Sequence, residues 1–436
     1  MNHAAAPTAG RRAALASFAG TAIEWYDFYL YGTASALVFG KLFFPELNPA
    51  TGVLAAFGTF WVGFLARPLG GIVFGHLGDR VGRKNTLVVT LLLMGFATFA
   101  VGLLPTYAKI GIAAPLLLVV LRAVQGVAVG GEWGGAVVLA AENAPAGRGS
   151  YFAMFAQQGS PAGSILSTVV FLAVSALPDE QFLTWGWRVP FLLSGVLVAL
   201  GLVIRLKVEE PAAFVRAKAN AAVAKVPLVE VLRTAWRTVL LGIGASIMGI
   251  AAAYFSNTFV LAWSTNELGI GRQTMLYVLL GVSVVQFCWQ PFAARLAERF
   301  GETRFMAVSL AGNIVVTVPM YLLIASGDAG LAFVGIAVAT VFGSGYYAVL
   351  AGFLTRGFPI HLRYTGISLS YQLCSTIFGG TTPFIAQALL NATHGAIWPV
   401  VIYHVALLAL TLTCVLALAR RTAAVAEAEK IPTRQG

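Results

Sequence analysis

Ionisable side chains inside long apolar segments are the residues of this chain whose types and spacing could do chemistry. Glu24 and Asp27 lie three residues apart in the first apolar segment, so they occupy adjacent parts of one helical face. Arg122, Gln125 and Glu132 lie in the fourth such segment. Because a charge inside a bilayer is costly, residues of this kind pair with one another or serve the passage of ions and polar solutes.

Two interpretations of Asp27 and Arg122 are open at this point. In the first, Arg122 binds an anionic substrate near the middle of the membrane and a carboxylate carries a proton. Asp27 is the first candidate for that carboxylate, and Glu24 and Glu132 are the others. A low-dielectric surrounding disfavours an ionised carboxylate whereas a nearby arginine favours it, so substrate bound to Arg122 would free the carboxylate to accept a proton. In the second interpretation, Asp27 and Arg122 form a buried ion pair that only holds two helices together.

Neutral polar side chains could complete a binding site for a hydroxylated substrate. Those in the first half of the chain are Gln125 and Tyr31, and those in the second half are Asn257, Gln286, Gln290, Tyr346 and Gln372. Each of them could equally be a packing residue whose hydrogen bonds are satisfied within the protein. Gly126, Gly130 and Gly134 follow one another at four-residue spacing, which predicts close packing of the fourth helix against a neighbour.

The composition is that of a membrane protein. Hydrophobic residues make up 58% of the 436, whereas soluble domains rarely exceed about half. The apolar runs reach the ~20 residues that span a bilayer as a helix, and they predict an all-α integral membrane protein with twelve transmembrane helices. We expect an N-terminal six-helix bundle over 1–207, a cytoplasmic linker with an amphipathic helix over 208–237, and a C-terminal six-helix bundle with a short tail over 238–436.

Charge and cysteine patterns narrow the location and the partners. Lys and Arg gather in alternate loops, which predicts a multi-pass protein of the inner (plasma) membrane with both termini in the cytoplasm. The net charge of +11 points to anionic lipid headgroups as partners and not to nucleic acid. Cys288, Cys374 and Cys414 show no paired spacing, so no metal site is expected. With no nucleophile motif and no phosphate loop, we expect a protein that is not an enzyme and has no cofactor. We also expect it to be a monomer.

A polar stretch at 75–87, which reads GHLGDRVGRKNTL, has a weaker copy at 294–304. The copy lies 219 residues later, close to half the chain length. The matched pairs are Leu77 with Leu296, Asp79 with Glu298, Arg80 with Arg299 and Gly82 with Gly301. This is the pattern of a duplicated transporter with two parallel halves.

The order of residues in 75–87 resembles the loop between helices 2 and 3 of the major facilitator superfamily. Stretches at 24–28, 122–126, 130–136, 185–191 and 363–366 resemble the metabolite:proton symporter family within it, and are most similar to shikimate-type carriers. The resemblance implies two pseudo-symmetric six-helix bundles and a proton-coupled symporter that imports a small organic acid by alternating access, driven by the proton gradient. Symport of a zwitterion such as proline or betaine and exchange of organic anions are alternatives, and a membrane-embedded enzyme is a remote one.

The same resemblance implies a cytoplasmic gate. Its main latch would consist of Asp79, Arg80, Arg83 and Arg148, which hold the two halves together when the site faces outward. Glu298, Arg299 and Arg363 would form a weaker counterpart in the second half. The halves would then rock about a site at the membrane midplane.

Overall fold

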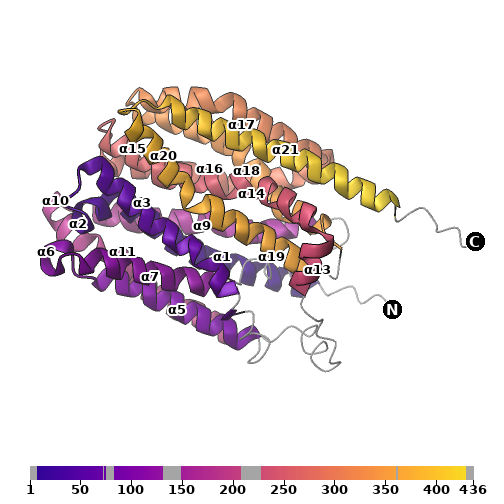
Figure 1. Ribbon diagram of the computed structural model, residues 1–436, viewed down its shortest axis with the longest axis horizontal. Helices are drawn as coiled ribbons and strands as arrows, with labels where there is room; N and C mark the ends of the chain where they lie inside the picture. The colour runs from indigo at the N-terminus through magenta and orange to yellow at the C-terminus, as the bar shows by residue number, and fades with distance from the viewer. Residues whose placement is uncertain are drawn as a thin grey trace, which may run out of the picture.

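The computed structural model describes residues 7–71, 73–74, 83–130, 149–207, 227–359 and 362–428. Every regular element in these ranges is helical. The long helices run side by side in one elongated bundle, and both described ends of the chain lie at the same end of it (Figure 1). We call this the terminal end and the opposite one the far end. Residues before 208 form the first half and residues from 227 onward the second half.

The first half is built from helices that begin and end where the sequence supplies caps and breaks. Asn48 accepts a hydrogen bond from Thr51 N at 2.9 Å, and Pro49 follows it at the first helical position, so the third helix starts there. The elements are α1 (Pro7–Ala34), η1 (Ser35–Phe39), α2 (Gly40–Phe43), α3 (Pro49–Leu65), α5 (Arg83–Leu103), α6 (Tyr107–Ile110), α7 (Ala113–Val129), α9 (Gly149–Ser175), α10 (Asp179–Gln181), η2 (Phe182–Gly186) and α11 (Arg188–Lys207).

The second half repeats this plan. Asp328 caps its helix by accepting from Leu331 N at 2.8 Å. The elements are α13 (Pro227–Thr234), α14 (Trp236–Tyr254), η3 (Phe255–Val260), α15 (Leu261–Asn266), α16 (Arg272–Phe300), α17 (Glu302–Ala325), α18 (Ala329–Arg356), α19 (Arg363–Cys374), η4 (Ser375–Gly379), α20 (Thr381–Ala392) and α21 (Trp398–Ala428).

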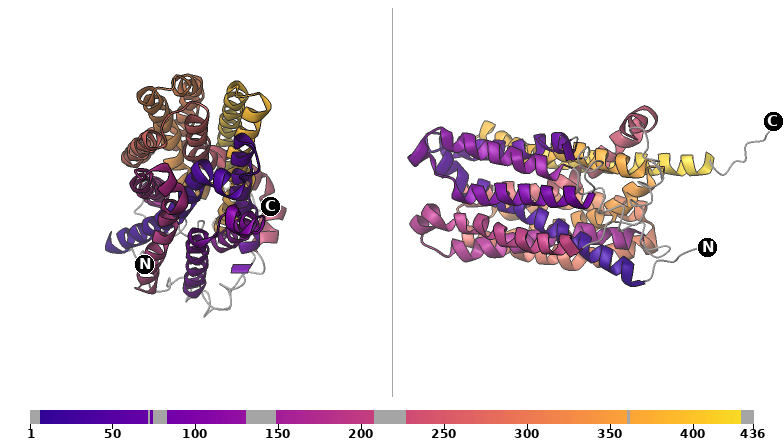
Figure 2. Two further views of the ribbon diagram at one scale, coloured as in Figure 1. Left: turned by 90° about the vertical axis from the view of Figure 1, so that its left-hand side faces the viewer. Right: turned by 90° about the horizontal axis from the view of Figure 1, so that it is seen from below.

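The helices confirm an all-α integral membrane fold with two six-helix bundles. In the described ranges, the helices that correspond to the twelve predicted spans are α1, α3, α5, α7, α9 and α11 in the first half, and α14–α15, α16, α17, α18, α19–α20 and α21 in the second. Seven described helices are long and apolar enough by themselves to cross a membrane, and the bent pair Asp179–Gly186 with Arg188–Val203 makes an eighth. The two halves lie beside each other in Figure 1 and in the left-hand view of Figure 2.

Short π-helical turns give a second sign of the internal repeat. η1 interrupts the first span at Ser35 and η3 interrupts the seventh at Phe255, 220 residues later. This offset is within one residue of the offset between the two polar stretches. The matched positions show that the two halves share local distortions as well as helix order. Such π-turns inside α-helices tend to occur at functional sites.

Small residues let the helices approach closely both within and between the halves. A methyl group at Gly126 would lie 2.0 Å from Gly63 O, and one at Gly130 would lie 2.2 Å from Arg67 O. The predicted close packing of the fourth helix is therefore confirmed for these two glycines, and Gly134 lies outside the described residues. Between the halves, a methyl group at Gly380 would lie 2.4 Å from Trp61 Cα.

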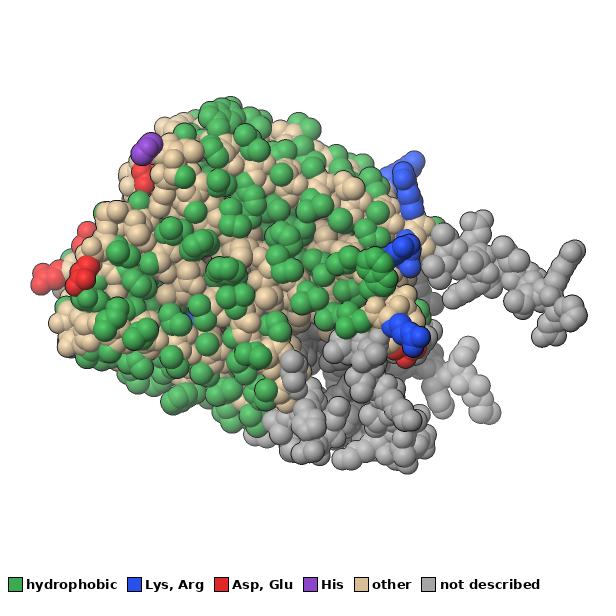
Figure 3. Space-filling view, viewed as in Figure 1, with side chains coloured by type: hydrophobic (Ala, Val, Ile, Leu, Met, Phe, Trp, Pro, Cys, Tyr) green, Lys and Arg blue, Asp and Glu red, His purple; other side chains and the backbone are tan. Residues whose placement is uncertain are grey.

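The surface separates into an apolar belt and two polar ends. Hydrophobic side chains cover the middle of the face shown in Figure 3, while Lys and Arg gather at the terminal end and Asp and Glu mostly at the far end. In the stretch expected to be a linker, α13 buries Val231 and leaves Leu232 exposed, and Trp236 is exposed at the start of α14. Contact of this amphipathic stretch with the membrane surface stays a prediction.

Candidate functional site

A chain of four hydrogen-bonded side chains connects Asp27 to Arg122 inside the first half. Asp27 is only 4% exposed, and its Oδ2 accepts from Thr98 Oγ1 at 3.1 Å. Thr98 Oγ1 in turn accepts from Gln125 Nε2 at 2.8 Å, and Gln125 Oε1 accepts from Arg122 Nη1 at 3.0 Å. The chain joins α1, α5 and α7, so three helices hold the carboxylate and the guanidinium at fixed places.

The bridge replaces the direct ion pair that was one interpretation of the sequence. Asp27 and Arg122 both lie in the described part of the chain, and no ion pair within 4.0 Å joins them. The neutral groups of Thr98 and Gln125 stand between the two charges. Gln125 was predicted from the sequence, but Thr98 was not, because its uncharged hydroxyl in α5 carries no charge signal.

Aromatic rings enclose Arg122, which is 1% exposed. Its Cζ lies 4.4 Å from the ring centroid of Tyr31, 4.8 Å from that of Phe60, 5.0 Å from that of Phe28 and 5.8 Å from that of Phe64. A desolvated cation over such rings gains about 2 kcal/mol. Gly63 provides the space, because a methyl group there would lie 2.5 Å from Arg122 Nε. The hydroxyl of Tyr31 is held by Thr59 Oγ1 at 2.9 Å.

A second buried arginine, Arg67, lies near this cluster. It is 4% exposed, and its Nη1 donates to Ser375 Oγ at 2.6 Å across the boundary between the halves. Its Cζ lies 4.4 Å from the Phe28 centroid and 4.6 Å from the Phe64 centroid, so Arg67 and Arg122 share these two rings. Arg67 was not predicted as a site residue from the sequence, although an arginine inside an apolar span is a signal that could have found it.

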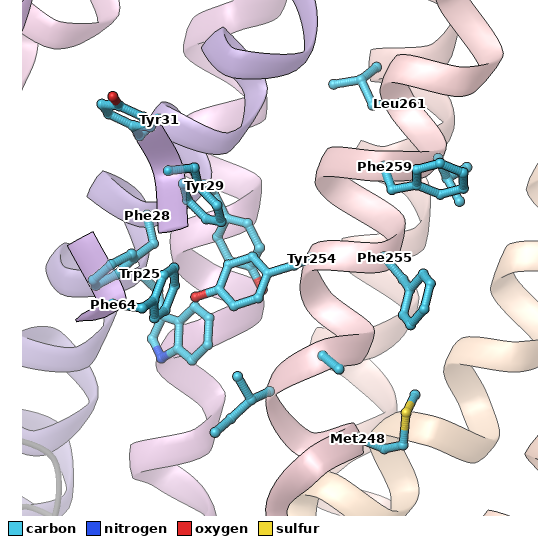
Figure 4. Close-up of a cluster of buried hydrophobic side chains, with 14 of the residues drawn as sticks. Trp25, Phe28, Tyr29, Tyr31, Phe64, Met248, Tyr254, Phe255, Phe259 and Leu261 are labelled. Carbon is cyan, nitrogen blue, oxygen red and sulfur yellow. The ribbon is translucent and has the colours of Figure 1, made fainter. Parts of the chain in front are cut away.

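A small pocket opens between the two halves beside Arg67. It is lined by Glu24, Trp25, Phe28 and Arg67 from the first half and by Ile250, Tyr254, Tyr371 and Ser375 from the second. Figure 4 shows Tyr254 reaching from α14 toward Trp25 and Phe64, and the ring centroids of Trp25 and Tyr254 are 6.2 Å apart. The remaining space holds about one water molecule, so a solute enters only after the halves move apart.

Described residues of the two halves contact each other at both ends of the molecule. At the far end, Arg272 Nη1 pairs with Asp179 Oδ1 at 2.6 Å. At the terminal end, Glu298 Oε1 accepts from Tyr151 N at 3.0 Å, in the first turn of α9, where a carboxylate is favoured by the helix dipole. Arg295 Nη2 also donates to Tyr151 Oη at 3.2 Å. Contacts between the described parts of the two halves therefore lie on both sides of the pocket.

The predicted site residues fall into different places. Asp27, Arg122, Gln125 and Tyr31 meet in the first half, and Glu24 lines the pocket. Asn257 Oδ1 accepts from Ser164 Oγ at 3.2 Å across the boundary between the halves. Gln290 is fully buried, and neither polar atom of its amide has a hydrogen-bond partner among the described residues.

The other predicted site residues of the second half, Gln286, Tyr346 and Gln372, do not line this pocket. Tyr346 donates to Ala245 O within its own half, and Gln286 and Gln372 are half-buried. Arg122 likewise is not among the pocket-lining residues of this closed conformation. Direct contact between any of these groups and a substrate stays a prediction.

Part of the expected gate is outside the described residues. The gate positions concerned are Asp79, Arg80, Arg148 and the side chain of Arg83. Glu132, a candidate proton carrier of the fourth span, also lies outside the described residues. Of the counterpart, Glu298 joins the halves, Arg299 is exposed and Arg363 is half-buried. The gating role of these residues stays a prediction. In the described ranges, no cluster of His, Cys, Asp and Glu could hold a metal ion.

Comparisons with known proteins agree with this architecture. A family model described as Major Facilitator Superfamily matches residues 18–383. The shikimate transporter of Escherichia coli (strain K12) is 42% identical over 91% of this chain and 91% of its own. The proline/betaine transporter of Salmonella typhimurium is 33% identical over 89% of this chain and 79% of its own.

Solved structures share the fold at low identity. A D-xylose-proton symporter superposes with a TM-score of 0.69 at 18% identity, covering 93% of this chain and 96% of that one. The xylose transporter XylE from E. coli, in a partially occluded inward-open conformation, gives 0.70 at 16% identity, covering 94% and 97%. At these identities the likeness concerns the fold alone.

Proposed function

Because the chain belongs to the major facilitator superfamily of transporters, we propose that it is a proton-coupled symporter that imports a small organic acid by alternating access. The proposed substrates are shikimate-like hydroxylated carboxylates, aromatic acids or dicarboxylates. The identity to a shikimate transporter over most of both chains supports this class. The protein is a transporter and not an enzyme.

The observation that carries the proposal is the bridge from Asp27 through Thr98 and Gln125 to Arg122. The single hydroxyl hydrogen of Thr98 has two acceptors within reach, Asp27 Oδ2 at 3.1 Å and Met94 O at 3.0 Å. An ionised Asp27 can accept that hydrogen. A protonated Asp27 can instead donate to Thr98 Oγ1, while Thr98 turns its own hydrogen to Met94 O. Both protonation states therefore keep their hydrogen bonds, as a cyclic proton carrier requires.

Orientation and motion follow from the same proposal. The terminal end would face the cytoplasm, because Lys and Arg gather there on the face shown in Figure 3. The halves would rock about the pocket as the far-end and terminal-end contacts break in turn. We propose that this occurs in a monomer in the inner membrane, with Glu24 and Glu132 as the alternative proton carriers.

Uptake into proteoliposomes tests the proposal. Labelled shikimate is supplied with an acidic outside medium, with and without a proton-conducting uncoupler, and Asp27→Asn is measured beside the wild type. We expect wild-type accumulation that collapses with uncoupler. Asp27→Asn should lose accumulation but retain exchange of internal for external solute, because exchange needs no net proton movement. Accumulation that survives the uncoupler would refute proton symport, and accumulation by Asp27→Asn would assign the proton to another carboxylate.

A zwitterion is the second candidate substrate, and the pocket gives one observation in its favour. Glu24 lines the same pocket as Arg67, with the rings of Trp25 and Tyr254 beside them. A quaternary ammonium is attracted to such rings, and a carboxylate of the same solute would be attracted to an arginine. The proline/betaine relative fits this reading. A competition panel decides between the two classes: unlabelled shikimate, other hydroxylated, aromatic and dicarboxylic acids, glycine betaine and proline each compete with the uptake of labelled shikimate. A zwitterion carrier is inhibited by glycine betaine and proline more than by unlabelled shikimate.

A further inference from the structure

We propose that Arg67 binds the carboxylate of the transported solute and thereby selects anionic or zwitterionic solutes at the pocket. This inference rests on the proposed function in that the solute is a carboxylate, and it names the group that would bind it. The candidate from the sequence was Arg122. Each arginine has one buried nitrogen without a hydrogen-bond partner among the described residues, but of the two only Arg67 lines the pocket.

Arg67 lines the pocket with much of its binding capacity unused. Its Nη1 has one neutral partner, Ser375 Oγ, and its buried Nε has no hydrogen-bond partner among the described residues. No ion pair within 4.0 Å engages Arg67 in the described part of the chain. Burying an arginine this deeply is unfavourable unless an anion or several acceptors compensate it. The planar fork of a guanidinium fits a carboxylate through two parallel hydrogen bonds.

Arg122 has a different set of contacts. It bonds Gln125 Oε1 and, at 3.4 Å, Phe60 O, and rings surround it within the first half. It does not line the pocket. Its hydrogen-bonded chain leads to Asp27. The two arginines therefore have different roles. Arg67 binds the carboxylate of the solute, and Arg122 acts on the proton-carrying group.

Two aromatic rings that contact both arginines connect solute binding at Arg67 with the group that carries the proton. Phe28 and Phe64 each lie within 6 Å of both guanidiniums, measured from Cζ to ring centroid. A carboxylate bound at Arg67 neutralises one of two like charges that face these rings in a low-dielectric interior. The Arg67–Ser375 bond also spans the boundary between the halves, so a solute in this position contacts the elements that must move together when the site closes.

Equilibrium binding to the purified full-length protein tests the assignment without a proton gradient. Labelled shikimate is the probe, or labelled glycine betaine if the competition panel selects the zwitterion. Unlabelled acid and its neutral methyl ester compete with it. The variants are Arg67→Gln and Arg67→Lys. The control is Arg188→Gln. Arg188 donates to neutral acceptors, the carbonyls of Gly102 and Leu104, and stacks on the ring of Trp187, but it lies outside the pocket.

The expected results are specific to an anion-binding role. Arg67→Gln should weaken binding of the acid about 10- to 100-fold and abolish the preference for acid over ester. Arg67→Lys should weaken it about 5- to 20-fold while keeping that preference, since the charge remains and the fork is lost. Arg188→Gln should stay within about 3-fold of wild type, because it leaves the pocket unchanged.

Several outcomes would overturn the assignment. Arg67→Gln that still prefers the acid over the ester removes Arg67 from carboxylate recognition. If Arg67→Gln fails to fold, wild-type affinity in Arg67→Lys does the same. The proposed function can fail separately from this assignment. If the wild type binds the acid but takes it up regardless of the uncoupler, proton symport is refuted, and the binding results alone decide the role of Arg67. A protein that binds neither shikimate nor betaine nor any acid of the panel overturns both.

Discussion

Replacing Arg272 with alanine should open the far end of the transporter. Arg272 begins α16 in the second half, and its ion-pair, hydrogen-bond and ring contacts are all with residues of the first half. Its Nη1 pairs with Asp179 Oδ1 at 2.6 Å, and its Nη2 donates to Ser175 O at 3.1 Å and Leu177 O at 3.2 Å. Its Cζ lies 4.1 Å from the Phe182 ring centroid. These contacts exist only while the far end is closed, so their loss destabilises the closed state alone.

The magnitude follows from the exposure of each partner. Asp179 is 83% exposed and Arg272 is 22% exposed, so their ion pair contributes less than about 1 kcal/mol. Each bond to a carbonyl adds about 1 kcal/mol and the cation–π contact about 0.5–1 kcal/mol. The total of about 3 kcal/mol corresponds to a roughly 100-fold shift toward the open state. Asp179→Asn removes only the ion pair and should shift the equilibrium less than about 5-fold.

Distances between spin labels across the far end measure this equilibrium. Gln181 in the first half and Gln273 in the second are both exposed there, and both become cysteine in a background whose three native cysteines are serine. The wild type should give mainly the short distance, Asp179→Asn a small long-distance fraction, and Arg272→Ala mainly the long distance. Equal populations in Arg272→Ala and Asp179→Asn would refute the reasoning, because they would show that the carbonyl bonds and the ring contact contribute nothing to closure.

Three further substitutions probe the bridge in the first half by initial rates of uptake. Gly63→Ala should reduce uptake at least about 10-fold at normal expression, because its methyl would lie 2.5 Å from Arg122 Nε. Gly58→Ala on the same helix is the control, since its methyl would meet only Phe384 at 3.7 Å, and equal loss in both would contradict the steric argument. Thr98→Val should reduce gradient-driven accumulation about 10-fold while Thr98→Ser retains it, because serine keeps the bridging hydroxyl; unimpaired accumulation by the valine variant would exclude the bridge from coupling. Arg122→Gln should reduce uptake about 100-fold with intact expression, and normal uptake would remove Arg122 from the mechanism.

The membrane fold and the duplicated plan could be predicted from the sequence because they depend on local composition. Whether a segment crosses a bilayer is set by the transfer free energy of its own ~20 residues, and that information survives without any tertiary contact. The repeat was visible at 294–304 because each half retains its own loop signal, and the π-turns at Ser35 and Phe255 have nearly the same offset. Asp27, Glu24 and Arg122 were also found this way, since charge inside an apolar span is a local anomaly.

Only the tertiary structure decided which of these groups meet. Thr98 bonds a carboxylate 71 positions away and Arg67 bonds a hydroxyl 308 positions away, and no local pattern encodes such pairs. A helix of given composition can rotate about its axis at almost no cost in burial within lipid, so close packing at residues such as Gly63, Gly126 and Gly380 selects the faces that touch. That packing places Arg122 behind aromatic rings and Arg67 at the boundary between the halves, a distinction that two arginines in two apolar segments could not show by sequence alone.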